Sequence, residues 1–511
     1  MIDRTEEPAS PKPRKRWRKT KWFYGVLLAY YAVTITATLS WTAYSHRKFR
    51  EAVDPIIARG EPLAWSDFAT EPIPDDQNAA ILYRQATEML LLSDSEPEYS
   101  REFRKAMDDS EWEFDGAIDG LLTSPEMRRK HPEDMRKVLD MGRDILALCR
   151  KARQLDKVDW AIDYDIAALE FPALPCGIQQ CREIVELLSL AAIDAHENGR
   201  DDEAIEYIRD GLALGDALSY APCTVTHLVT IAIYSISSQP LEEILPGIKI
   251  GDAPGSVSAD NLRSLITDLM DTDRCSRSLA LAVMSVRSSR YDSGRCFINM
   301  GTVGGQGGDG RLRNVYGARL GSAGITGWGY DVCVGSLWRI ETARAVSYLD
   351  AYVNISNART LPEFKRDAPQ THDCSEHVFP RVLSCMLLPA FERTFVMHYQ
   401  TLMKRQMAGV AIAVRMYQID HGRLPDTLGQ LVPDYLAEVP QDPMGEPGTR
   451  IRYVNDPNTP LLYSVGRDGR DDGGNHKDLV DGVYACKDIP WFLNGRPVMP
   501  EKESAPDDGD D

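Results

Sequence analysis

The sequence predicts a mainly α-helical protein with one transmembrane helix near its N-terminus, a stack of helices in the middle and a small α+β module near its C-terminus. Three observations support this fold class. A stretch without charged residues runs from Trp22 to Tyr44. Apolar residues then recur at three- and four-residue spacing, the period of an amphipathic helix. Short apolar runs separated by Pro and Gly follow Asp420, as expected for strands and turns.

Composition limits the classes of partner. The 511 residues are enough for about two to four domains. A net charge of -19 disfavours binding to nucleic acid, because a phosphate backbone requires a basic surface. We therefore expect no nucleic-acid partner.

Residues 1–20 are rich in Pro and basic side chains and lack apolar periodicity, which predicts a disordered cytoplasmic tail. Residues 21–45 are the predicted transmembrane helix, because residues 22–44 are long enough to cross about 30 Å of hydrocarbon. Aromatic side chains at both ends of this stretch are typical of the membrane interface. The apolar run is longer than in most cleaved signal peptides, and no Ala-x-Ala site follows it, so we expect an uncleaved anchor.

Basic residues predict the orientation of this helix. Those that precede it are Lys12, Arg14, Lys15, Arg16, Arg18, Lys19 and Lys21, and those that closely follow it are Arg47, Lys48 and Arg50. The excess on the N-terminal side keeps that end in the cytoplasm. We therefore expect a single-pass protein of the bacterial inner membrane, with the bulk of the chain in the periplasm or otherwise outside the cytoplasm.

Residues 46–77 are expected to form a juxtamembrane helix, ending near Arg59, and then an extended linker containing Pro62, Pro72 and Pro74. Helical periodicity begins at Asn78 and predicts a helical-stack domain over residues 78–290.

The clearest unit of this stack is a helical hairpin. Gly199 is placed to end one helix in a left-handed conformation, and the acidic residues from Asp201 suit the N-terminus of the next. This turn, followed by Ala204, Ile208 and Gly211, resembles the tetratricopeptide helix pair, in which small residues let two helices approach closely. The resemblance covers one repeat and implies a tetratricopeptide-like stack; an unrelated helical bundle with one similar hairpin is the alternative.

Residues 291–335 are rich in Gly and predict a long loop, whereas residues 336–394 return to a helical pattern. The loop lacks a following Gly-Lys-Ser/Thr, so we do not expect nucleotide binding. The ten cysteines are dispersed, which predicts small buried side chains. An oxidising compartment would allow a local disulfide such as Cys176–Cys181.

Residues 395–488 are predicted to form the α+β module. An apolar stripe indicates a long helix that ends near Asp420, followed by a short helix around Leu428 to Leu431. Strands are expected at residues 450–454 and 461–465, before an acidic loop over residues 466–478. Residues 489–511 are expected to be an acidic disordered tail.

The module resembles the C-terminal domain of the major pseudopilin of type II secretion. The matching residues are Tyr417, Asp420, Gly422 and Pro425; Leu431 to Leu436; Val439, Pro440, Asp442 and Pro443; and Tyr463, Ser464, Gly466, Asp468 and Gly469. A pseudopilin begins with a basic leader and its own hydrophobic helix, whereas here the membrane helix lies far upstream and lacks the processing motif. Assembly into a pseudopilus is therefore not expected. The overall arrangement resembles bacterial membrane-anchored proteins whose function the resemblance does not supply.

In pseudopilins the acidic loop binds calcium, which prefers six to eight oxygen ligands. The resemblance implies that Asp468, Asp471, Asp472 and Asp478 provide carboxylates, with carbonyl groups from Ser464 and Val465. The alternative is an acidic turn in which Asp serves turn geometry and solubility. Both interpretations stay open, and calcium is the only cofactor to be considered.

Catalytic motifs are missing from the sequence. The single compact group of metal-capable residues, His372 to His377, lacks a fourth zinc ligand and is typical of a polar loop. No Gly-x-Ser-x-Gly or His-Glu-x-x-His motif occurs. We therefore expect a noncatalytic envelope protein that binds an unknown protein partner. The alternatives are a component of a type II secretion or pilus-like assembly, and an envelope hydrolase acting at His372 to His377.

Overall fold

The computed structural model describes residues 14–90, 121–122, 125–164, 177–299, 335–369, 378–475 and 487–497. The chain divides into two compact units, each made of two segments. Unit 1 comprises Met1–Glu61 with Tyr291–Ser347, and unit 2 comprises Pro62–Arg290 with Tyr348–Asp511. The described residues are mainly helical, with one small antiparallel sheet, so the predicted fold class is confirmed at this level.

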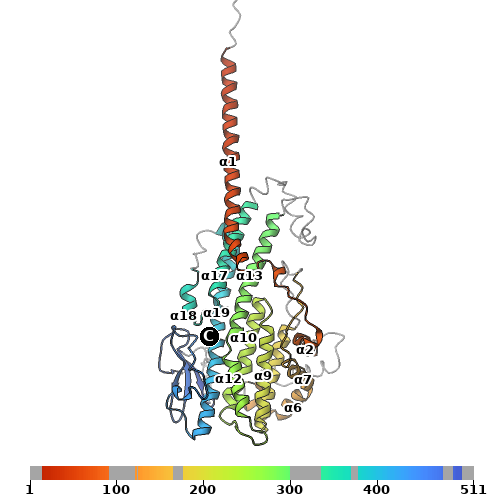
Figure 1. The fold of residues 1–511 in the computed structure, drawn as a ribbon, viewed down its shortest axis with the longest axis vertical. Coiled ribbons are helices and arrows are strands. Elements are labelled where there is room, and N and C mark those ends of the chain that lie inside the picture. Colours follow the sequence, from red (N-terminus) through yellow and green to blue (C-terminus); the bar gives the residue numbers. More distant parts are fainter. Residues whose placement is uncertain are drawn as a thin grey trace, which may run out of the picture. The chain divides into compact units, whose positions relative to one another are not determined.

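The N-terminal helix α1 (Arg14–Ala58, red in Figure 1) belongs to unit 1. It begins within the stretch expected to be a disordered tail, and it ends next to the predicted boundary at Arg59. Large apolar side chains along it are exposed, for example Trp22 (74%), Leu28 (71%) and Val33 (68%). This helix is long and apolar enough to cross a membrane, a property that it shares with signal sequences.

Thr34 and Thr36 within α1 pair their hydroxyl groups with the preceding turn, whereas the Thr42 hydroxyl has no hydrogen-bond partner among the described residues. Thr34 donates to the carbonyl oxygen of Tyr30 at 3.0 Å, and Thr36 donates to that of Ala32 at 2.8 Å. These bonds to the preceding turn reduce the cost of placing a hydroxyl group in hydrocarbon.

Unit 1 also contains the end of α13 (Asp273–Asn299) and most of α17 (Ser336–Ile355). A Cβ atom at Gly294 of α13 would lie 2.0 Å from the Thr342 hydroxyl oxygen of α17, so only glycine permits this approach. Near the end of α1, Phe49 stacks on Tyr291 with 6.0 Å between ring centroids. Aromatic and small side chains therefore hold these helices together within the unit.

Unit 2 contains the helical stack. Short 3-10 helices η1 (Trp65–Phe68) and η2 (Asp75–Gln77) lie in the predicted Pro-containing linker. The α-helices are α2 (Ala79–Glu88), α5 (Pro125–Lys130), α6 (Pro132–Met141), α7 (Arg143–Ala152), α8 (Ile178–Glu197), α9 (Asp201–Leu218), α10 (Thr224–Ser238), α11 (Pro240–Ile244), α12 (Ala259–Met270), the first part of α13, α18 (Leu361–Asp367) and α19 (Val378–His421). Helices α9, α10, α12 and α19 lie side by side (Figure 1).

The predicted hairpin is formed by α8 and α9. Gly199 adopts φ +72° at the turn, which confirms the left-handed helix end expected there. The buried Asp201 carboxylate fixes the turn: it pairs with His196 at 2.6 Å and accepts the Lys249 N–H at 2.8 Å. The hairpin is thus closed by hydrogen bonds that involve both ends of the turn.

Small residues let α9 pack closely on α10. A Cβ atom at Gly211 would lie 2.5 Å from the Ser237 hydroxyl oxygen, and one at Gly215 would lie 2.7 Å from the Tyr234 ring. The small residue expected at Gly211 therefore does allow two helices to approach closely. The tetratricopeptide-like identity of the stack stays a prediction.

The three-stranded sheet has the order β1 (Arg452–Val454), β2 (Leu461–Ser464) and β3 (Ile489–Phe492), with antiparallel neighbours. Leu462 is opposite Tyr453 on one side and Trp491 on the other. The first two strands and the 3-10 helix η6 (Leu428–Leu431) lie where the sequence predicts them. Residues 489–511 were expected to be a disordered tail, but residues 489–492 form strand β3. The strand is ordered because its apolar side chains are buried against the rest of the unit.

One hydrophobic core joins the stack and the sheet. It includes Ile208 of α9, Leu265 of α12 and Val410 of α19 together with Leu462 and Trp491 of the sheet. A second cluster lies between α2, α6, α7 and α8 and contains the buried free thiols Cys149 and Cys181. The partner proposed for Cys181, Cys176, lies outside the described residues. Helix α19 therefore packs on the stack and on the sheet.

Candidate functional site

The loop that follows β2 holds three of the four predicted calcium ligands, but their carboxylates have separate partners. Asp468 accepts the Arg470 N–H at 3.0 Å, and Asp472 lies 4.0 Å from the Lys487 ammonium group. Asp471 forms an ion pair with Arg452 at 2.9 Å. The fourth, Asp478, lies outside the described residues. Within the described ranges no three His, Cys, Asp or Glu side chains converge as a metal would require.

A buried aspartate, Asp442, which sequence reasoning named only as part of the pseudopilin resemblance, anchors the start of this loop. The Asp442 carboxylate accepts the N–H groups of Met444 and Val465, each at 2.9 Å, and the Ser464 hydroxyl at 2.8 Å. Burial raises the pKa of Asp442, while these donors favour its ionised form. Asp442 thus ties the turn after Pro440 to the end of β2.

Asp488 closes the other end of the loop and was not singled out by sequence reasoning; it is the last residue of the predicted module and directly precedes β3. Its Oδ2 atom accepts the N–H groups of Asp472, Gly474 and Asn475 at 3.0, 2.8 and 3.3 Å. Its Oδ1 atom is buried and has no hydrogen-bond partner within the described ranges. Burial raises the pKa of Asp488. A buried carboxylate oxygen without a donor is costly unless a cation or water meets it.

An open groove of about 620 Å³ lies beside β1. It is lined by Asp426, Thr427, Leu428, Gly429, Val432, Glu438, Val439, Arg450, Ile451 and Tyr453. The Tyr453 hydroxyl is buried and has no hydrogen-bond partner among the described residues, and burial raises its pKa to about 12. The groove combines apolar side chains such as Val432 and Ile451 with charged ones such as Glu438 and Arg450, and binding sites commonly join apolar walls to a few polar groups.

The two edge strands of the sheet differ in how they are covered. At β3, the Phe492 N–H donates to the Glu242 carboxylate of α11 at 3.2 Å. Next to β1, the Ile451 N–H donates to the Pro440 carbonyl oxygen at 3.2 Å, just before the strand begins. The groove lies next to β1, whose only strand partner within the described residues is β2. An edge of this kind can pair with an extended segment of another chain.

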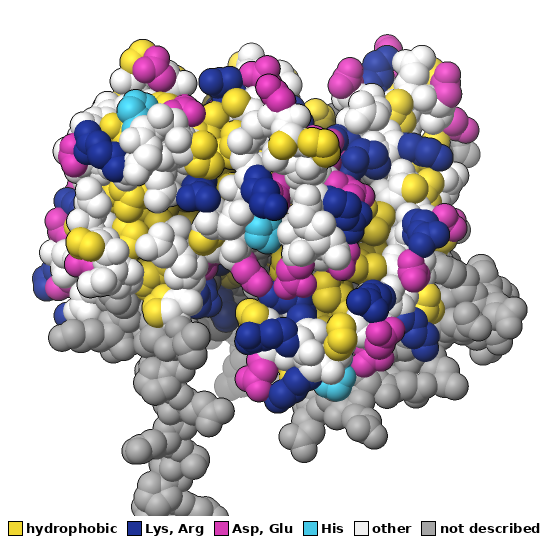
Figure 2. All heavy atoms as spheres, turned by 90° about the horizontal axis from the view of Figure 1, so that it is seen from below, with side chains coloured by type: hydrophobic (Ala, Val, Ile, Leu, Met, Phe, Trp, Pro, Cys, Tyr) yellow, Lys and Arg dark blue, Asp and Glu magenta, His cyan; other side chains and the backbone are white. Residues whose placement is uncertain are grey.

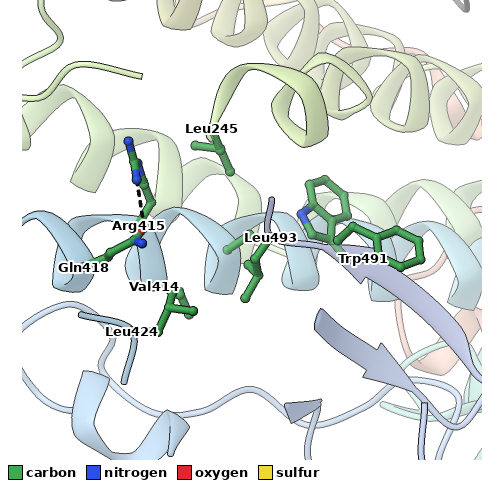
Figure 3. Close-up of a pocket in the computed structure, with 9 residues that line it drawn as sticks. Leu245, Val414, Arg415, Gln418, Leu424, Trp491 and Leu493 are labelled. Carbon is green, nitrogen blue, oxygen red and sulfur yellow. Dashed lines mark hydrogen bonds between the residues drawn. The ribbon is translucent and has the colours of Figure 1, made fainter. Parts of the chain in front are cut away.

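A much smaller cavity, of about 10 Å³, lies between α19 and β3 (Figure 3). Its walls include Trp491 and the guanidinium group of Arg415, which donates to Gln418 at 2.8 Å. Burial lowers the pKa of Arg415. Because this volume holds about one water molecule, the cavity is a packing defect rather than a ligand site.

His131, His196, His227 and His398 lie far apart in the sequence. The structure brings His227 and His398 together in the interior, whereas His196 pairs with Asp201 and His131 with Asp134 near the surface. The pairing of His227 with His398 had no sequence signal, because the two residues are far apart in the chain. The candidate metal cluster His372 to His377 lies outside the described residues.

No protein-family model matches the chain, and neither the curated proteins nor the solved structures include a significant match. The resemblances to pseudopilins and to tetratricopeptide repeats therefore rest on the motifs alone.

Proposed function

We propose that this protein is a noncatalytic, membrane-anchored envelope protein that binds a protein partner through its helical stack and its pseudopilin-like module. The observation that carries the proposal is the exposed apolar surface of α1. Side chains from Trp22 to Leu39 expose large apolar areas to the surroundings. Water penalises such a surface by about 25 cal/mol per Å², whereas a bilayer accommodates it.

The orientation follows from the basic residues on either side of the span. Seven precede it, from Lys12 to Lys21, and three closely follow it, from Arg47 to Arg50. This bias favours a cytoplasmic N-terminus and an extracytoplasmic location for the rest of the chain. The membrane is then the bacterial inner membrane.

Partner binding is supported by the groove beside β1. Its volume and apolar walls suit an extended peptide segment, and the neighbouring strand edge can accept additional main-chain hydrogen bonds. On the face shown in Figure 2, acidic and basic side chains are interspersed and hydrophobic side chains lie between them. Such a mixed surface is typical of protein contacts rather than of nucleic-acid binding.

Calcium binding by the loop is part of the proposal. The implied ligands are Asp468, Asp471, Asp472 and Asp478, and the unpaired Oδ1 of Asp488 is a further oxygen close to the same loop. Calcium would require Asp471 and Asp472 to leave Arg452 and Lys487. Bound calcium would hold the loop against β3 without any catalytic role.

A second candidate is a component of a type II secretion or pilus-like assembly. The order of elements favours it, because α19 is followed by η6 and a three-stranded antiparallel sheet. This is the order that the resemblance to the pseudopilin C-terminal domain implies. Under this hypothesis the partner is itself a pseudopilin-like protein.

Site-specific photocrosslinking in membranes tests both candidates. The full chain carries a photoreactive residue at Glu438, which lines the groove, or at Asp434, an exposed control that does not line it. The full chain is needed because the stack and the sheet share one core, so deletions would disrupt both. We expect one specific protein adduct from Glu438 and none from Asp434. A pseudopilin-like partner supports the second candidate; no adduct, or equal adducts from both positions, contradicts binding in the groove.

A further inference from the structure

Two histidines face each other in the interior of unit 2, where α10, α13 and α19 meet. His227 and His398 are fully buried, and their ring centroids lie 5.4 Å apart. The His227 Nδ1 atom is 3.0 Å from the Ser278 hydroxyl oxygen, and the His398 Nδ1 atom is 3.5 Å from the Cys275 sulfur. Both Nε2 atoms are buried and have no hydrogen-bond partner in the part of the chain that the structure describes.

The charged groups around this pair do not compensate a positive charge. From α19, the buried Arg405 guanidinium lies 4.1 Å from the centroid of the Tyr234 ring of α10. It donates to the carbonyl oxygens of Asp268, in the last turn of α12, and of Asp271, just after that helix. From α9, Asp216 accepts the Tyr234 hydroxyl at 2.6 Å and pairs with Arg274 of α13.

The aromatic neighbour of His398 on α19 is uncharged. Tyr399 meets His398 edge-on at 5.1 Å, and its hydroxyl donates to the Ala358 carbonyl oxygen. Within the described residues, neither imidazole forms a hydrogen bond or an ion pair with an Asp or Glu. A proton on His227 or His398 would therefore place a second cation near Arg405, and the neighbouring carboxylate, Asp216, already pairs with Arg274.

Burial keeps both imidazoles neutral. It lowers the pKa of His227 to about 3, and it lowers the pKa of His398 well below its ordinary value, with the charges of His227 and Arg405 adding to the effect. An exposed histidine has a pKa near 6.5. Any opening that exposes the rings therefore takes up protons below about pH 6.5, while the closed form does not.

We propose that the His227–His398 pair makes the junction of α10, α13 and α19 acid-sensitive, so that acidification opens it locally and loosens the helix that leads into the sheet. The proposal is independent of the membrane-anchor function. The neutral pair makes its full contribution to stability above about pH 6.5, and this contribution is lost as the pH falls toward 3. Such a loss on acidification is expected for histidines whose pKa is lower in the folded state than in the unfolded state.

Linkage gives the expected size of the effect. Each histidine that becomes exposed raises the opening constant about 10-fold per pH unit below its unfolded pKa. Between pH 7 and pH 5 one histidine contributes about 25-fold and two contribute about 600-fold. Burial also raises the pKa of Asp216, so protonation of this carboxyl group favours the closed form as the pH falls and opposes the effect of the histidines. Variants of the histidines are therefore needed to isolate their contribution.

Cys275 provides a direct readout, because its thiol lies against His398 and belongs to the large core. The full chain in detergent is treated with 4,4′-dithiodipyridine between pH 7 and pH 5. The thiol attacks the reagent disulfide, which yields a mixed disulfide and releases one thiopyridone. Mass spectrometry quantifies labelling at each cysteine relative to the denatured chain at the same pH, which removes the intrinsic pH dependence of the thiol. Cys149 and Cys181, buried in the second cluster, report on global unfolding.

We expect normalised Cys275 labelling to rise by about 600-fold from pH 7 to pH 5, while Cys149 and Cys181 rise far less. The double variant with His227→Gln and His398→Gln should lose this dependence, and each single variant should keep about 25-fold. His131→Gln, at a surface position, should behave like the unaltered chain. If the double variant fails to fold, as Cys149 labelling at pH 7 would reveal, the single variants provide the test. Parallel labelling of Cys149 and Cys275, or an unchanged pH dependence in the histidine variants, would overturn the proposal.

Discussion

Replacing Trp491 with alanine tests whether the helical stack and the sheet share one core. Trp491 lies on β3, is 6% exposed and belongs to the cluster that contains Val410 of α19 and Leu265 of α12. Figure 3 shows its indole ring beside α19. The neighbouring Phe492 is equally well buried but packs in a separate small cluster with Leu461 and Tyr463.

The magnitude follows from the buried area. A buried Trp side chain removes about 150–250 Å² from water, and at about 25 cal/mol per Å² this stabilises the core by roughly 4–6 kcal/mol. Truncation to alanine retains part of that area but leaves a cavity, so the expected cost is about 3–5 kcal/mol. Amides that exchange through the affected opening should then exchange about 100- to 3000-fold faster.

Hydrogen exchange followed by mass spectrometry on the full chain in detergent measures this effect segment by segment. In Trp491→Ala, peptides from β2 and from residues 407–417 of α19 should both lose protection, because they contribute to the same core. Peptides from α2 and α7, in the second cluster, should change little.

Phe492→Ala is the matched control, since it removes an aromatic side chain from the adjacent position on the same strand. It should reduce protection in β2, which contributes Leu461 and Tyr463 to that cluster, and affect α19 much less. Equal effects of the two variants on α19, or an α19 that keeps its protection in Trp491→Ala, would refute a core shared by stack and sheet.

Four further predictions concern the anchor, the interior and the loop. Val33→Arg, at the centre of the span, should add about 2.5–3.5 kcal/mol to the cost of membrane insertion and shift the protein toward alkaline-extractable fractions, whereas Val33→Leu should not. Arg405→Met should lower the free energy of unfolding by about 2–5 kcal/mol, because it leaves the Asp268 and Asp271 carbonyl oxygens without their donor; Arg405→Lys should cost less, and no change in denaturation would contradict this role. Asp488→Asn should abolish any stabilisation by calcium, which is worth about 2.7 kcal/mol at 100 times Kd; a thermal shift with millimolar calcium that persists in this variant would exclude Oδ1 of Asp488 as a ligand. The free energy of unfolding should fall by about 1.4 kcal/mol per pH unit for each of His227 and His398 below about pH 6.5, and this contribution should be missing from the Gln variants in denaturant titrations at a series of pH values.

Long periodic elements were predictable from the sequence because their periodicity is local. The stripe from Val396 to Tyr417 indicated a helix ending near Asp420, and α19 ends at His421. Gly199 and the acidic residues that follow it located the turn between α8 and α9. In each case neighbouring residues carry the whole physical reason for the structure.

Features that depend on distant contacts were not predictable. Strand β3 is a four-residue apolar run whose partner strand and core lie elsewhere in the chain, so it was grouped with the acidic tail. Asp442 is part of the motif that resembles pseudopilins, but the sequence does not show that its carboxylate is buried. Asp488 carries no signal in a chain with 77 acidic residues, since only folding buries it. The meeting of His227, Cys275 and His398 likewise requires three helices to pack together.

The central claim is that α1 anchors the protein in a membrane with the rest of the chain outside the cytoplasm. Fusion of alkaline phosphatase, which folds only outside the cytoplasm, after Asp511 and after Lys21 tests it most directly. We predict an active enzyme in the first fusion, an inactive one in the second, and a membrane-bound chain that retains its N-terminus. The reverse activity pattern, or a soluble chain whose N-terminus lies beyond Tyr44, would contradict the account.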